Sequence, residues 1–89
     1  MANDPNLRLS DREVASMFAA DTDAQRYPPI LTLEEAADLL RIPVGTVRDW
    51  RSRGLLDGCC TRVGKRVRFL RNRLVQHVFS RGLRPDERR

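Results

Sequence analysis

The residues of this chain that could do chemistry are mostly arginines, and they are concentrated in its second half. All of the 17 basic side chains except Lys65 are arginine, whose planar fork fits phosphate oxygens and guanine edges. Residues 1–40 carry three basic and eight acidic side chains, a balance of −5, whereas residues 41–89 carry fourteen and four, a balance of +10. This division favours a polyanion, above all a nucleic acid, over a merely well-solvated basic surface.

Residues that could support catalysis or bind a metal are scarce. The chain has one histidine, His77, and two adjacent cysteines, Cys59 and Cys60. Together they would supply at most three zinc ligands without the usual spacing, and one histidine supports no Ser/His/Asp arrangement. We therefore expect no enzymatic activity, no metal and no cofactor. We also expect reduced cytosolic thiols and a surface position for His77.

The length of 89 residues, of which 40% are hydrophobic, predicts one domain with a small core. No apolar run approaches the roughly 18 residues of a membrane helix, and no secretory signal is visible, so we expect no membrane contact. The domain is expected at residues 30–82. Residues 83–89 are expected to form a basic mobile tail.

Residues 1–29 are expected to form a flexible arm, a short helix and a proline-rich linker. Ser10 and Glu13 fit a capping box that begins the helix. The apolar stripe after it covers the domain core, contacts another protomer or frays; it consists of Val14, Met17 and Phe18. Residues 21–30 are predicted to be a linker, because two consecutive prolines interrupt any helix there.

Two short helices joined by a tight turn are predicted between Thr32 and Gly54. Thr32 and Glu35 form a second capping box, and the apolar face that follows consists of Leu33, Ala36, Ala37 and Leu40. Pro43 suits the first turn of the next helix, and Gly54 suits its end. The inward residues of that helix are Val47 and Trp50. Such a helix-turn-helix commonly places its second helix in the major groove of DNA.

A β-hairpin and a last helix complete the predicted domain. Gly64-Lys65 suits a two-residue type II′ turn. Alternation along the strands predicts one apolar face, made of Thr61, Val63, Val67 and Phe69, and one basic face, made of Arg62, Arg66 and Arg68. The helix is expected over residues 71–81, with Leu74, Val75, Val78 and Phe79 facing inward and Gly82 ending it. The order of elements predicts a winged helix-turn-helix fold, mainly α with a small hairpin and an extra N-terminal helix.

At three segments the sequence resembles the MerR-like DNA-binding domains of excisionases. The segments are Leu31–Leu40, Thr46–Trp50 followed by Gly54, and Val63–Phe69 followed by Leu74. Among excisionases the chain most resembles recombination directionality factors of integrative and conjugative elements. A small transcriptional regulator of the same fold that binds a promoter is the alternative.

The resemblance implies a protein that binds specific double-stranded DNA, bends it and promotes excision by a separate site-specific integrase. Several copies would bind adjacent sites, and the protein would work in the bacterial cytoplasm in association with the nucleoid. The candidate contacts between copies are Val14, Met17 and Phe18, together with the N-terminal arm and the tail. The acidic first half of one copy could also meet the basic second half of the next.

The expected DNA-binding residues lie on the second helix, the wing and the start of the last helix. Arg48 could form a bidentate contact with guanine, and Asp49 could accept from cytosine or orient a neighbouring arginine. Wing cations would lie along the backbone or in the minor groove, although a charged edge that prevents strand pairing is the plainer alternative. The full set is Gly45, Thr46, Arg48, Asp49, Arg51, Ser52, Arg53, Arg62, Gly64, Lys65, Arg66, Arg68, Arg71 and Arg73.

Overall fold

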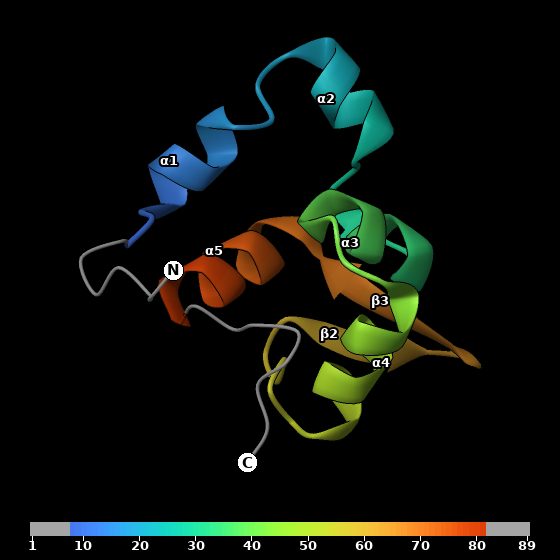
Figure 1. Cartoon of the computed structure of the whole chain (residues 1–89). Coiled ribbons are helices and arrows are strands. Elements are labelled where there is room, and N and C mark those ends of the chain that lie inside the picture. Colours follow the sequence, from blue (N-terminus) through green and yellow to red (C-terminus); the bar gives the residue numbers. More distant parts are fainter. Residues whose placement is uncertain (1–7, 82–89) are drawn as a thin grey trace.

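The computed structural model describes residues 8–81, which form five helices and three strands (Figure 1). In chain order these are α1 (Asp11–Ser16), α2 (Asp21–Arg26), β1 (Ile30–Leu31), α3 (Leu33–Leu40), α4 (Val44–Ser52), β2 (Cys60–Val63), β3 (Arg66–Leu70) and α5 (Arg71–Arg81). From α3 onward the order confirms the predicted winged helix-turn-helix. The predicted arm at residues 1–7, the stop at Gly82 and the tail at 83–89 lie outside the described residues. No helix within the described residues is long and apolar enough to cross a membrane.

The three strands form one antiparallel sheet in the order β1-β3-β2. Strand β1 was not predicted, because two residues are too few to show alternation. β1 joins the sheet by pairing Leu31 with Phe69, and both side chains are fully buried. The segment before α3 is thereby fixed to the wing, so the helix-turn-helix and the hairpin share one core.

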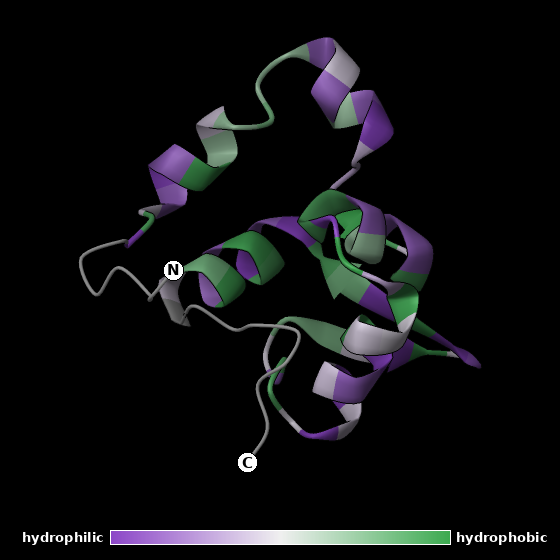
Figure 2. Cartoon of the chain, viewed as in Figure 1, coloured by the Kyte–Doolittle hydropathy of each residue, from purple (hydrophilic) through white to green (hydrophobic). Residues whose placement is uncertain are grey.

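That core lies between the sheet, the α3–α4 pair and α5. Trp50 and Leu56 come from α4 and the loop after it, and Leu74 comes from α5; they pack with Leu31 and Phe69. Figure 2 shows the apolar stretches of α3, β3 and α5 lying toward one another and the hydrophilic tip of the wing projecting away. The predicted inward residues Val47, Trp50 and Leu74 are buried, whereas Phe79 is 44% exposed.

The N-terminal helix α1 packs on α5 of the same chain. Its predicted capping box is present: the Glu13 N–H donates to Ser10 Oγ at 3.1 Å, and the Ser10 N–H donates to the Glu13 carboxylate at 2.8 Å. Val14 and Phe18 are buried against Val75 of α5. Of the three alternatives expected for this apolar stripe, covering the core is the one the structure shows for Val14 and Phe18, because α5 offers a second apolar side that α1 covers. Met17 remains 47% exposed.

The segment predicted as a linker contains a helix, α2. Asp21 and Asp23 lie in its first turn, where carboxylates interact favourably with the helix dipole, and it buries no side chain. A helix without an apolar face leaves no periodic signal in the sequence. Its C-terminal end is held by Asp38 of α3, which accepts hydrogen bonds from Tyr27 Oη at 2.5 Å and from Arg26 Nη2 at 3.2 Å.

These two hydrogen bonds stabilise the ionised Asp38. The Tyr27 hydroxyl first, and the Arg26 guanidinium second, hold the pKa of Asp38 below its usual range. The same hydrogen bond raises the pKa of Tyr27. A carboxyl group whose pKa is depressed in the folded state contributes stability above its unfolded pKa, and that contribution is lost as pH falls through the folded value. The α2–α3 contact therefore weakens in acid.

The turn between α3 and α4 places a non-glycine residue in the left-handed region. Arg41 ends α3 with φ 60° and ψ 43°, a conformation that a β-carbon disfavours. Gly54, which follows α4, has φ 78° without steric strain, because glycine has no β-carbon. The helix-turn-helix therefore carries backbone strain at Arg41.

Replacing this arginine by glycine should stabilise the fold. We expect Arg41→Gly to raise the free energy of unfolding by about 0.5–1 kcal/mol, the left-handed strain relieved less the entropy that glycine loses. Urea unfolding followed by the fluorescence of Trp50, the one tryptophan in the sequence, would measure it. Gly45→Ala is the matched comparison. It adds a β-carbon inside α4, where that carbon meets no atom within 4 Å, whereas Arg41→Gly removes one in the left-handed region. An unchanged or lowered stability for Arg41→Gly would contradict the strain.

Candidate nucleic-acid interface

Helix α4 presents a polar side to solvent because its apolar side is fully used by the core. Val47 and Trp50 are buried, whereas the predicted DNA-contacting residues of α4 are exposed or, for Thr46, half-buried: Gly45, Thr46, Arg48, Asp49, Arg51, Ser52 and the following Arg53. A Cβ added to Gly45 would meet no atom within 4 Å. The fold itself therefore does not require glycine at this position, which agrees with its expected use in a close approach to DNA.

The wing is the hairpin of β2 and β3, closed by the predicted two-residue turn. Val63 pairs with Arg66 across Gly64-Lys65, and Gly64 has φ 64° while Lys65 is not among the residues of positive φ. One positive φ, at the first central position, is the pattern of a type II′ turn. The turn prediction is confirmed.

The predicted faces of the wing, in contrast, are wrong. Residues paired directly across two strands lie on the same face, and the register pairs Arg62 with Val67 and Thr61 with Arg68. One face therefore holds Cys60, Arg62, Val67 and Phe69, and the other holds Thr61, Val63, Arg66 and Arg68. The prediction continued the alternation through the turn, but a two-residue turn reverses the chain so that the parity changes between the strands. Val63, 59% exposed, belongs to the outer face.

A groove of about 300 Å³ lies between α4, the wing and the start of α3. Its α4 wall is formed by Arg48 and Arg51. Its wing wall carries cations from both faces of the hairpin, which are Arg62, Lys65, Arg66 and Arg68. The guanidinium of Arg68 also donates to the Val67 carbonyl at 3.0 Å. Six cations from two predicted surfaces thus meet in one concave site, the basic groove.

A model of a helix-turn-helix domain family matches residues 30–78, more than half of the chain and the part that builds this groove. The chain belongs to this helix-turn-helix family. The family is typical of excisionase-like small DNA-binding proteins. No curated protein and no solved structure matches the chain. Double-stranded DNA is therefore the partner of this helix-turn-helix protein, and the basic groove is its candidate interface.

The remaining α4 residues of the helix-turn-helix protein lie beside the groove rather than in it. Asp49 forms an ion pair with Arg53, with Arg53 Nη1 3.0 Å from Asp49 Oδ2. Of the two expected roles of Asp49, orienting an arginine is therefore the one present without DNA. Ser52 Oγ donates to the Asp49 carbonyl at 3.0 Å. Gly64 forms the wing turn, and Gly45 and Thr46 lie in the first turn of α4.

The groove wall includes residues that the sequence analysis did not assign to DNA. Thr32, Leu33 and Glu34 at the start of α3 line it together with Val67. The capping box located the start of α3 correctly, but the sequence carried no signal that this end of the helix would meet the wing. That contact depends on β1, which places the start of α3 beside β3.

Arg71 was predicted to contact phosphate, and the structure contradicts this. It is 8% exposed, and its guanidinium donates to the Tyr27 carbonyl and to Asn72 Oδ1, both at 2.8 Å. The same group lies 4.0 Å from the centroid of the Phe18 ring. Burial lowers the pKa of Arg71. Arg71 is therefore a structural cation that joins α1 and the end of α2 to α5.

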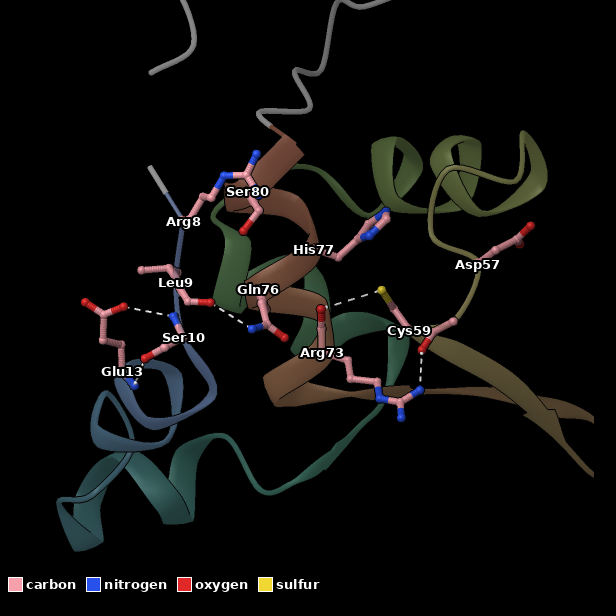
Figure 3. A pocket seen from close by; sticks show the side chains of 11 residues that line it. Arg8, Leu9, Ser10, Glu13, Asp57, Cys59, Arg73, Gln76, His77 and Ser80 are labelled. Atoms are coloured by element: carbon pink, nitrogen blue, oxygen red, sulfur yellow. Dashed lines mark hydrogen bonds between the residues drawn. The ribbon is translucent and has the colours of Figure 1, made fainter. Parts of the chain in front are cut away.

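Arg73 was also predicted to contact DNA, but it lines a different depression, of about 630 Å³, between α5, the residues before α1 and the loop before β2 (Figure 3). Its Nη1 donates to the Gly58 carbonyl at 3.3 Å. Gln76 of α5 donates to the Leu9 carbonyl at 2.7 Å on the opposite side. This depression shares no residue with the basic groove, so Arg73 does not line the groove.

Cys59 and His77 line the same depression, and both make contacts to backbone carbonyls. Burial raises the pKa of Cys59 to about 11 and also raises the pKa of Cys60. Both thiols are therefore protonated near neutral pH and make weak hydrogen bonds to the carbonyls of Arg73 and Leu56. His77 Nε2 lies 2.7 Å from the Leu55 carbonyl, so the predicted surface histidine is in fact half-buried and tied to the loop after α4. In the described part of the chain, no three His, Cys, Asp or Glu residues are grouped to hold a metal ion.

Two exposed arginines test the location of the interface. Arg62→Ala should weaken duplex binding and reduce the slope of log K against log salt by about 0.9, the loss of one phosphate contact. Arg73→Ala removes the same side chain outside the groove and should leave both quantities unchanged. Fluorescence anisotropy with a labelled mixed-sequence duplex over a salt series would measure them. Equal losses in the two variants would show that net charge, and not the groove, determines binding.

Arg71 should affect stability rather than DNA binding. We expect Arg71→Lys to lower the free energy of unfolding by about 1–3 kcal/mol, because lysine keeps the charge but loses the planar fork that bonds Tyr27 and Asn72 and stacks on Phe18. Urea unfolding followed by Trp50 fluorescence would measure this loss, with Arg73→Lys as the control. At urea-free equilibrium the folded variant should bind duplex DNA as tightly as the parent. A variant of unchanged stability with weakened DNA binding would instead indicate that Arg71 contacts DNA.

Proposed function

We propose that this protein is an excisionase, a recombination directionality factor that binds attachment-site DNA cooperatively, bends it and promotes integrase-mediated excision of a mobile element. The observation that supports this most directly is the basic groove, whose two walls are formed by α4 and the wing. Membership in a family typical of excisionase-like proteins is the second support. The protein would have no enzymatic activity of its own and would act in the bacterial cytoplasm on nucleoid DNA.

The two walls of the groove suit two parts of a duplex. Helix α4 would lie in the major groove, where Arg48 could form a bidentate contact with guanine. The wing would lie over the adjacent backbone and minor groove, where a narrow A·T-rich minor groove attracts arginine. Cations on both sides of a concave site neutralise phosphates along one side of the duplex, which favours bending toward the protein. Smoothly bending a site of 20–30 base pairs costs about 1–6 kcal/mol.

Cooperative neighbours would help to offset that cost. With Val14 and Phe18 buried in the chain's own core, the surface available to another copy on the N-terminal side includes the exposed Met17 and polar side chains. Its polar part includes exposed carboxylates such as Glu13 of α1 and Asp23 of α2. Figure 1 shows the wing projecting away from α1 and α2. A contact between the acidic side of one copy and a basic side of the next is heterologous, so it does not close and can continue along DNA.

Footprinting and excision assays test this function. Over attachment-site DNA, protection should extend in regular steps as protein concentration rises, and excision of a circular product by the element's integrase should require the protein. The variant Arg62→Ala/Arg66→Ala should lose both effects, because it removes two cations of the wing wall, and Arg73→Ala should retain them. Excision that proceeds equally without the protein would defeat the proposal. A single footprint of constant size at a promoter would instead indicate a transcriptional regulator.

A further inference from the structure

The basic groove contains one side chain of the opposite sign. Of the residues that line it, six are cationic and one, Glu34, is a carboxylate. Glu34 is exposed on the first turn of α3. Within the described residues the ion pairs are Arg26–Asp38 and Arg53–Asp49, and neither includes Glu34. An unpaired negative charge therefore lies on the surface that receives a polyanion.

The cap of α3 does not depend on this carboxylate. Thr32 Oγ1 accepts from the Glu35 N–H at 3.1 Å, and Glu35 Oε1 accepts from the Thr32 N–H at 2.9 Å. Glu34 adds only the general attraction of an acid to the positive end of a helix. Asp21 has the same attraction at the start of α2, and Asp21 does not line the groove. Helix α3 also has a second carboxylate, Glu35, in its first turn, and Glu35 is not among the residues that line the groove.

We propose that Glu34 is an affinity-limiting residue of the DNA interface. This inference rests on the assignment of the basic groove to duplex DNA. Phosphates that approach Arg48, Arg51 and the wing must also approach the Glu34 carboxylate, and like charges at short distance repel whatever the base sequence. The repulsion lowers affinity for every duplex alike. It keeps a small protein with six groove cations from being held on non-cognate DNA, so that base contacts from α4 contribute a larger share of the binding free energy at a true site.

The experiment compares two variants that each remove one negative charge. We expect Glu34→Gln to raise the affinity for a labelled mixed-sequence duplex by roughly threefold to tenfold at low salt, the effect of removing one like charge from a partly solvated site. The gain should shrink as added salt shortens the Debye length. Asp21→Asn should change affinity by less than half as much on a logarithmic scale. Glu34→Lys, a change of two charges, should roughly double the logarithmic gain of Glu34→Gln.

The outcomes separate this inference from the assignment on which it rests. If the parent protein binds no duplex in a salt-dependent manner, the DNA-binding groove itself is wrong. If the parent binds but Glu34→Gln and Asp21→Asn have equal effects, Glu34 has no special position and the inference fails. Weaker binding by Glu34→Gln would also overturn it, because the carboxylate would then accept a hydrogen bond from a base. Thermal unfolding checks that each variant is folded at the assay temperature.

Discussion

The geometry of the interface depends on the two-residue turn at Gly64-Lys65. With φ 64° at Gly64 the chain reverses at once, and Val63 is forced to pair with Arg66. That single pairing determines the face of every other wing residue. It places Phe69 in the core opposite Leu31, and it places Arg62 on the same face, further toward the tip, beyond the reach of the core. A turn longer by one residue would exchange the two faces of one strand relative to the other, and Arg62 would no longer share a face with Val67 and Phe69.

A second constraint acts at the other end of β3, where Arg71 follows the strand directly. Its backbone N–H donates to the Pro29 carbonyl at 2.9 Å and its side chain to the Tyr27 carbonyl at 2.8 Å. These bonds hold the chain segment that enters β1, while the guanidinium lies over Phe18 of α1. The N-terminal helices, the sheet and α5 therefore meet at one buried cation. In a protein of this charge, a cation that supports the fold and a cation that binds DNA have the same sequence signature, and only their burial and position in the structure distinguish them.

The sequence predicted those parts of the structure whose causes are local. Both capping boxes, the turn type at Gly64 and the inward positions of Val47 and Trp50 depend on residues within one or two turns of each other. It could not predict β1, which exists only because β3 lies beside it, or α2, which has no apolar face. The faces of the wing could have been deduced from the turn type. The deduction requires the rule that the residues flanking a two-residue turn pair and share a face, rather than alternation continued through the turn. Six of the predicted interface residues line the groove, and the start of α3 was missed because a long-range pairing brings it there.

The net charge of +5 is therefore the sum of charged side chains with different roles in the structure. Arg71 stabilises the fold, Asp49 and Arg53 neutralise each other beside α4, and Asp38 fastens the end of α2. Six cations that form no ion pair with an acid line the groove, where Glu34 is their one acidic neighbour. In the proposed interface, affinity for a polyanion depends on the six groove cations and is opposed by one carboxylate. What decides binding is thus which charges the two-residue turn and the short strand β1 bring to the same groove.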